Sequence, residues 1–488
     1  MWKKALPLAA AVFALALPAA GSSPATPLSL AECIDLAARQ NLGYLNDLRD
    51  VEATREQLRQ ARSEFGLDID ASFDLPTYSE SRQLQDDIAL IQRVREENTT
   101  MEYQGRTTMS QRIPHVGRLS VTASGSRNDF SSNRRVDRRE FIGDLQVAYT
   151  RDLLYTPAAE IQLQQAEIGL SISQSNLHRR ELQLEEQVTN SFYDLVQAIR
   201  ELEIQQQRLE QSTAALDLAL RKFEIGLIAE VEALHLRVEK LRAEAEFNRA
   251  QTQIERQRDR LREILGMEMG DPLEVLTSVD HETVPIAEGP AVEFGLRRRS
   301  DLREAEWARQ SSELSLKDLE QQLGPTAQLT TRLTLLGRGP DASDVSSTFE
   351  RSFVSAGVRM ELPLVDGGER RARVRRAEID LEKSLLNTES VERRIAREIR
   401  DAVRNVREAE QQIELGREEL TVAERTYDVE RSRFELGLAD SQELLQAQTA
   451  LTQARLDGLR EAIDYQRALA GLRVATMADL AELRKTGE

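Results

Sequence analysis

Residues 223–227, Phe-Glu-Ile-Gly-Leu, return 211 positions later as Phe-Glu-Leu-Gly-Leu at residues 434–438. The same shift, without a gap, places Ala166-Glu167-Ile168 on Ala377-Glu378-Ile379. Solenoid units are much shorter, at roughly 20–50 residues. The chain therefore consists of two similar halves rather than a series of small repeats.

Two stretches without proline surround these motifs, and both are expected to be long helices. No proline occurs between 158 and 271, or from 364 to the end of the chain. Because proline breaks helix interiors, a helix from Ala158 to about Ile225 is possible, about 100 Å long at 1.5 Å per residue. The glycine of each motif is expected to end its helix in the left-handed conformation. Helix then resumes over 229–266 and 440–476, so each half is a long helical hairpin.

Large apolar residues recur every seven positions along both long helices, which is typical of a coiled coil. The companion positions are mostly small, as at Ala198 and Ala409, which lets helices pack closely. The large residues are Val188, Leu195, Leu202, Leu209, Leu216 and Phe223 in the first half, and Ile399, Val406, Ile413, Leu420, Tyr427 and Phe434 in the second.

Segments of alternating polarity precede both long helices. Residues 67–73 and 327–335 alternate apolar with polar side chains, and 143–149 and 354–360 are the expected return strands. Strands of about ten residues with one apolar face are typical of membrane β-barrels, although an ordinary half-buried sheet gives the same pattern. The first half also carries extra material between residues 76 and 140. It includes a possible hairpin (106–112 and 118–125) that either adds to a barrel or decorates its outer end.

The first 21 residues are expected to be a secretory signal peptide. Lys3 and Lys4 precede an apolar core at 5–20, with small residues at the expected cleavage site. No later stretch reaches the ~18 apolar residues of a transmembrane helix. Cys33 is the only cysteine, which excludes an intrachain disulfide, and its place in a helical pattern argues against lipidation.

Composition and motifs argue against several function classes. The net charge of −18 gives little support to nucleic-acid binding. The basic run Arg297-Arg298-Arg299 is expected to be solvated helix surface. The four histidines are scattered without metal-ligand spacing, and no phosphate loop, nucleophile elbow or His-Glu metal helix is found. The sequence therefore predicts no enzyme activity, no metal and no cofactor.

These features together resemble the TolC family of outer-membrane channel-tunnels over nearly the whole mature chain. The residues that carry the resemblance are 28–34, Leu-Ser-Leu-Ala-Glu-Cys-Ile, then 362–368, Leu-Pro-Leu-Val-Asp-Gly-Gly, and the two Phe-x-x-Gly-Leu motifs. The resemblance implies a homotrimer with one shared β-barrel in the outer membrane. The helical hairpins would form a hollow cylinder that crosses the periplasm.

The resemblance also implies candidate site residues at the hairpin tips. Glu443 matches an acidic constriction position, where three carboxylates would favour cations; its alternative is a solvated helix residue. Asp440 is an additional acid there, whereas Gln446 and Ala439 replace a second acidic position and a basic latch position. The positions that receive a periplasmic adaptor protein match Gly226, Leu227, Gly437 and Leu438, although a simple helix end would explain the glycines.

The sequence thus predicts a mainly α fold with a membrane β-barrel and an internal tandem repeat. The expected divisions are a signal peptide (1–21), repeat 1 (28–270), a linker or equatorial segment (271–290) and repeat 2 (291–488). The expected function is a passive outer-membrane duct for efflux or type I secretion, joined by an adaptor to an inner-membrane pump. The alternative is a periplasmic adaptor or structural coiled-coil protein without a pore, expected to have one hairpin between compact β domains.

Overall fold

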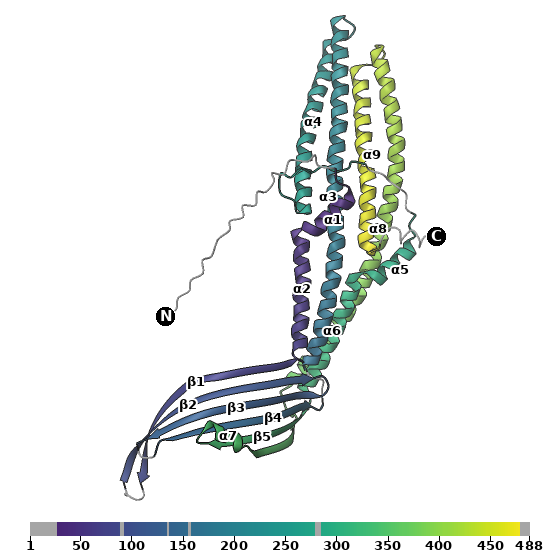
Figure 1. The fold of residues 1–488 in the computed structure, drawn as a ribbon. Helices are drawn as coiled ribbons and strands as arrows, with labels where there is room; N and C mark the ends of the chain where they lie inside the picture. Colours follow the sequence, from purple (N-terminus) through teal and green to yellow (C-terminus); the bar gives the residue numbers. More distant parts are fainter. Residues whose placement is uncertain (1–26, 88–91, 134–135, 155–157, 279–284, 479–488) are drawn as a thin grey trace, which may run out of the picture. The chain divides into compact units, whose positions relative to one another are not determined.

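The computed structural model describes residues 27–87, 92–133, 136–154, 158–278 and 285–478. The expected signal peptide lies outside the described residues. The helices are α1 (Leu30–Gln40), α2 (Leu42–Ser63), α3 (Ala158–Glu224), α4 (Glu230–Leu265), α5 (Glu288–Arg298), α6 (Ser300–Leu323), α7 (Ala342–Ser347), α8 (Glu369–Glu435) and α9 (Ser441–Thr476). The strands are β1 (Leu67–Asp87), β2 (Gln92–Ile113), β3 (Gly117–Ser132), β4 (Arg138–Asp152), β5 (Thr326–Gly339) and β6 (Glu350–Glu361) (Figure 1).

The chain forms two compact units, and both sequence repeats contribute to each. The helical unit comprises residues up to 45, 183–285 and 402–472, and it contains both hairpin tips. The sheet unit comprises residues 46–182, 286–401 and the segment from 473 onward, and it contains all six strands.

The predicted helical hairpins are confirmed nearly to the residue. The long helices α3 and α8 each have 67 residues, and their partners α4 and α9 each have 36. The 211-residue shift maps the bounds of α3 onto those of α8, and those of α4 onto those of α9. None of the helices within the described ranges combines the length and apolar character needed to cross a membrane.

Heptad residues form the core of the helical unit. Val188, Leu195 and Val406 are fully or almost fully buried. Phe434 is only 1% exposed, but its repeat counterpart Phe223 is 41% exposed. Equivalent positions of the two repeats are therefore buried to different extents within one chain, and Phe223 is left available for contact with another copy.

All six strands form one antiparallel sheet in the order β1-β2-β3-β4-β5-β6. The extra hairpin of the first half is β2 and β3, and it lies inside the sheet between β1 and β4. Both strands of this hairpin are therefore paired within the sheet. The expected strand at 143–149 belongs to β4, which pairs with β3 on one side and β5 on the other.

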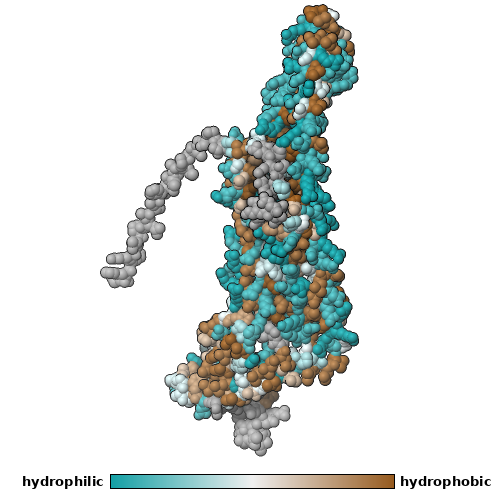
Figure 2. Space-filling model, turned by 90° about the vertical axis from the view of Figure 1, so that its right-hand side faces the viewer, coloured by the Kyte–Doolittle hydropathy of each residue, from teal (hydrophilic) through white to brown (hydrophobic). Residues whose placement is uncertain are grey.

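The sheet has one apolar and one polar face, as the alternation predicts. Residues that pair across the strands form rows on a common face. One row is Ile69, Met109, Val121, Val147, Leu333 and Val354. The next row, on the opposite face, is Asp68, Ser110, Ser120, Ala148, Arg332 and Ser355. Figure 2 shows apolar side chains gathered over the sheet at its lower end.

The single cysteine is a core residue. Cys33 lies in α1, which begins with a capping box between Ser29 and Glu32, and its side chain is buried against α3 and α4 residues such as Leu195 and Leu261. Burial raises the pKa of Cys33 to about 11. Because the folded state holds the thiol proton more tightly than the unfolded chain does, the protonated Cys33 stabilises the fold. This stabilisation is complete below the ordinary thiol pKa of about 8.5 and is lost as pH approaches 11.

We therefore expect Cys33 to be inert toward a thiol reagent at pH 8 in the folded protein, because the reactive form is the thiolate and the side chain is covered. Release of thionitrobenzoate from Ellman's reagent measures this directly. Full reaction should appear only in denaturant, and rapid reaction of the folded protein would contradict the buried placement of α1.

Candidate functional site

Both hairpin tips end their long helices through the same backbone motif. Gly226 and Gly437 have φ angles of +75° and +76°, which glycine adopts without steric cost. The amide of Leu227 donates to the carbonyl of Lys222 at 2.8 Å, and the amide of Leu438 donates to that of Arg433 at 2.8 Å. This pattern is a Schellman motif, so the helix-end interpretation of both glycines is correct.

The tips present apolar side chains to solvent. Leu227 and Leu438 are exposed, and so are Ile225 and Leu436, the residues before each glycine. Figure 2 shows this apolar patch at the upper end of the molecule. Exposed apolar patches of this kind mark interaction surfaces, because water penalises them in an isolated chain. The adaptor role of Gly226, Leu227, Gly437 and Leu438 stays a prediction that this exposure favours.

A buried lysine joins the two tips. Lys222 is almost completely buried, and its Nζ donates to the carbonyl of Phe434 and lies 4.5 Å from the centre of the Phe434 ring. The ammonium thus meets a carbonyl at the C-terminus of α8, where the helix dipole is negative. The sequence analysis missed this residue, because the contact joins positions 212 apart in the chain.

Replacement Lys222→Met should loosen the α8 end, because the Phe434 carbonyl loses its charged donor, worth about 1.5–3 kcal/mol, and keeps only the amide of Gly437. Hydrogen exchange followed by mass spectrometry should show the amides of Gly437 and Leu438 exchanging roughly tenfold faster or more. The exposed neighbour Arg221→Met is the matched control and should leave exchange unchanged. Equal exchange in both variants would contradict the role of Lys222.

Asp440 and Glu443, the acidic candidates for a pore constriction, form a capping box at the start of α9. The Asp440 carboxylate accepts from the amides of Gln442 and Glu443, both at 2.9 Å, and Glu443 Oε2 accepts from the Asp440 amide at 3.4 Å. Gln446 is exposed one turn later. In the first repeat Ala229 occupies the corresponding cap position and supplies no side-chain bond. The box fixes where both carboxylates lie, and their constriction role stays a prediction.

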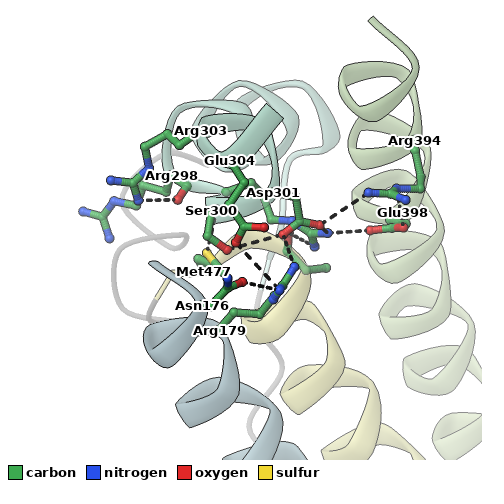
Figure 3. Close-up of polar contacts among 12 residues, drawn as sticks. Asn176, Arg179, Arg298, Ser300, Asp301, Arg303, Glu304, Arg394, Glu398 and Met477 are labelled. Atoms are coloured by element: carbon green, nitrogen blue, oxygen red, sulfur yellow. Dashed lines mark hydrogen bonds and ion pairs between the residues drawn. The ribbon is translucent and has the colours of Figure 1, made fainter. Parts of the chain in front are cut away.

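A charged cluster in the sheet unit was not anticipated. Arg299 Nη2 donates to Asp301 at 2.7 Å and to Glu398 of α8 at 2.8 Å, and Nη1 donates to the carbonyl of Ala475 at 3.2 Å. Asp301 lies between Arg179 of α3 and Arg394 of α8, each 3.8 Å away (Figure 3). The expectation of a solvated arginine run is wrong for Arg299, which is 9% exposed because the α5–α6 turn directs it inward.

Burial and neighbouring arginines have opposite effects on the pKa of Asp301. Burial raises its pKa, but the charge and hydrogen bond of Arg299 and the charge of Arg179 outweigh burial and lower it. Because the pKa is lowered, the ionised Asp301 stabilises the folded chain, and this stabilisation is present at pH values above the ordinary pKa of a carboxyl group. It is lost as pH falls through the folded-state value.

We expect Arg299→Leu to destabilise the folded chain by about 3–5 kcal/mol, because it leaves Asp301 and Glu398 without their shared partner. Arg297→Leu, in an exposed pair with Glu293, is the matched control and should cost less than about 1 kcal/mol. Loss of helical circular dichroism in urea provides the measurement, repeated at lower pH. The account fails if the two variants unfold alike at neutral pH.

Comparisons with known proteins agree with this geometry. Residues 118–267 and 295–476, more than half of the chain, match the family model described as outer membrane efflux protein. The chain therefore belongs to the outer membrane efflux protein family. This family comprises channel and transport proteins. A comparison with curated protein sequences gave no significant match.

Solved structures share the fold at low sequence identity. VceC from Vibrio cholerae has a TM-score of 0.69 at 14% identity, over 92% of this chain and 96% of that one. CmeC from Campylobacter jejuni has 0.68 at 14%, over 94% and 89%. The open state of MtrE from Neisseria gonorrhoeae has 0.67 at 14%, over 92% and 89%. All three are outer-membrane proteins or channels. The predicted family, the mainly α fold and the internal repeat are confirmed, and the shared β-barrel stays a prediction.

Proposed function

We propose that this chain is the outer-membrane channel of an efflux or type I secretion system, in which three copies form one continuous passive duct. The observation that carries the proposal is the two-faced sheet together with two tandem hairpins. A periplasmic adaptor without a pore was expected to have one hairpin between compact β domains, whereas the described part of the chain has two hairpins and one six-stranded sheet. The two repeats, which the linker joins, form the two halves of one ring subunit.

The sheet supports closure with other copies. Within the described residues, β1 and β6 have no strand on their outer sides. An apolar face suits lipid, but a sheet edge in lipid leaves backbone groups without partners, at several kilocalories per mole each. A ring of copies in which β6 pairs with β1 of the next removes every edge, and the resemblance to the TolC family implies three copies.

The helical unit supports the same ring through its repeat. Within one chain α3 packs on α9: Gln448 Nε2 donates to Ser212 Oγ at 2.8 Å, and Arg467 pairs with Asp194. The 211-residue shift converts α3 into α8, and α9 into α4. The helices α8 and α4 lie on the outer sides of the four-helix unit, with α3 and α9 between them (Figure 1).

These outer faces carry uncovered apolar residues. Leu415, Val422 and Val429 are exposed at heptad spacing on α8. On α4, Leu241 is 59% exposed, whereas its counterpart Thr452 on α9 is only 6% exposed. A second copy that places its α4 against α8 would cover both faces, as α9 covers α3.

A pair of cysteines should therefore report the assembly. In a Cys33→Ala background, Arg256→Cys with Asn405→Cys, the exposed shifted counterparts of Arg467 and Asp194, should link different copies into dimers and trimers. The pair Arg467→Cys with Asp194→Cys is the control and should link only within a chain. Denaturing gels after treatment with a short bis-maleimide distinguish them. Monomers alone from the first pair, beside a linked control, would contradict the ring.

The tips are proposed to receive a periplasmic adaptor and, through it, an inner-membrane pump. Leu438 and Leu227 offer apolar contacts beside glycines whose lack of a side chain lets a partner approach the backbone. In the ring, Glu443 and Asp440, with Gln446 one turn on, would line the narrow end and favour cations. Export by the N-terminal signal would place the sheet in the outer membrane and the hairpins in the periplasm.

A photo-crosslinking residue at Leu438 in living cells tests this docking. Mass spectrometry should identify a periplasmic adaptor: one that serves a proton-driven pump indicates small-solute or metal efflux, and one that serves an ATP-driven exporter favours protein secretion. The same residue at exposed Arg393 is the control and should capture no adaptor. Absence of adaptor at Leu438 in well-expressed protein would overturn tip docking.

A further inference from the structure

The connection between the last strand and the last long helix exposes a short apolar segment. β6 ends at Glu361 and α8 begins at Glu369. Between them, Leu362 is 56% exposed, Leu364 is 90% exposed and Val365 is 93% exposed. The segment follows directly on a strand whose apolar face suits lipid. In the proposed duct it therefore lies where the sheet leaves the membrane on the periplasmic side.

Hydrogen bonds give this connection a defined conformation. The Asp366 carboxylate accepts from the amides of Gly368 at 3.0 Å and Arg370 at 2.8 Å. Arg370 Nη1 donates to the carbonyl of Pro363 at 3.1 Å. Gly367 and Gly368 turn the chain with φ angles of +66° and +93°, which suit glycine. The apolar side chains are therefore left uncovered by a fixed turn and not by a loose loop.

Five arginines follow within the first eight residues of α8, where Glu369 is the only acid. Cations at a helix N-terminus oppose the helix dipole, and like charges four residues apart, as at Arg371 and Arg375, repel each other. This arrangement destabilises the isolated chain, so it calls for an anionic partner. The five are Arg370, Arg371, Arg373, Arg375 and Arg376.

The chain itself balances only part of this charge. Arg371 and Arg376 are exposed and form no ion pair within the described ranges. These two guanidinium groups are free to bind an anion from outside the chain. The other three arginines have partners on their own helix or in the turn: Arg370 with Pro363, Arg373 with Glu369, and Arg375 with Glu378 and Glu382.

The first repeat has the same helix without the arginines. α3 begins at the position that the 211-residue shift predicts and has the same 67 residues as α8. The arginines are therefore not needed to start or to cap a helix at this place in the fold. The corresponding residues of α3 are Ala159, Glu160, Gln162, Gln164 and Gln165.

We propose that residues 362–376, the basic turn, bind the phosphate groups of anionic phospholipids at the periplasmic surface of the outer membrane. The inference rests on the proposed function, which places the sheet in that membrane. Leu364 and Val365 enter the apolar edge of the leaflet, and Arg371 and Arg376 pair with phosphate oxygens at its surface. Basic residues beside apolar ones are typical of segments that lie in a membrane surface. The lipid charge also offsets the repulsion among the arginines.

Native mass spectrometry of the full chain tests the role of charge, with equal amounts of phosphatidylglycerol and phosphatidylethanolamine added in detergent. The wild-type protein should retain phosphatidylglycerol preferentially. Arg371→Gln with Arg376→Gln should reduce this preference about 25-fold, at about fivefold for each arginine near an anionic surface. Arg393→Gln with Arg397→Gln is the matched control, because these exposed arginines lie about 33 Å further along the same helix. The control pair should leave the preference unchanged, since that distance exceeds the Debye length.

Two results would overturn the inference and leave the channel function standing. One is an equal lipid preference in the wild type, the arginine variant and the control. The other is loss of the trimer in the arginine variant at unchanged lipid preference, which would assign Arg371 and Arg376 to contacts between copies. A protein that retains phosphatidylglycerol through the basic turn but passes no current would sustain the inference and contradict the proposed function.

Quenching of tryptophan fluorescence by lipids with brominated acyl chains tests the apolar contact. In a Trp307→Phe background, after removal of the signal peptide, Leu364→Trp should be quenched when the full chain is reconstituted in such lipids. Leu386→Trp is the control and should not be quenched, because this exposed position lies about 25 Å beyond the start of α8. Equal fluorescence of Leu364→Trp in brominated and ordinary lipid would overturn the inference.

Discussion

The structure depends on one constraint: a sheet with an apolar face must place no unpaired edge in lipid. The six strands pair throughout, yet one chain leaves β1 and β6 open on their outer sides within the described residues. In water such edges bind solvent, but in hydrocarbon they have no partner. The apolar row from Ile69 to Val354 makes lipid the favourable surroundings of that face, and the polar row beside it makes a wet lumen favourable. Both demands are met only when copies close into a ring.

Because the sequence is duplicated, such a ring needs few different kinds of helix contact. Some contacts inside the helical unit have a shifted counterpart that faces outward. Phe434 is buried under Lys222, whereas Phe223 and Arg433, their counterparts, are exposed. In the proposed ring, one type of helix contact would serve within a chain and between chains. Three copies would approach sixfold symmetry in the helices, while the β2–β3 insertion would break it in the sheet.

Much of this fold could be predicted from sequence because its periodicities are long. The 67-residue helices follow from two proline-free stretches, and Gly226 and Gly437 mark their ends within two residues. The fate of the 76–140 segment could not be predicted, since alternation is the same whether a hairpin lies in a barrel or beyond it. Arg299 and Lys222 were missed for a different reason. Their partners are distant in sequence, and a charged residue in a charged helix gives no local sign of burial. Asp440 and Glu443 carry the capping-box pattern, but the sequence analysis considered them as pore residues, with solvated helix surface as the alternative for Glu443, and not as a cap.

The central claim is that this chain forms a continuous water-filled path, and conductance across a planar lipid bilayer tests it most directly. Purified protein added to one side should produce discrete, stable steps of current. Those steps should favour cations, and Glu443→Gln should reduce the preference if three such carboxylates line the narrow end. Rings that insert in the bilayer but pass no current at any voltage would contradict the account.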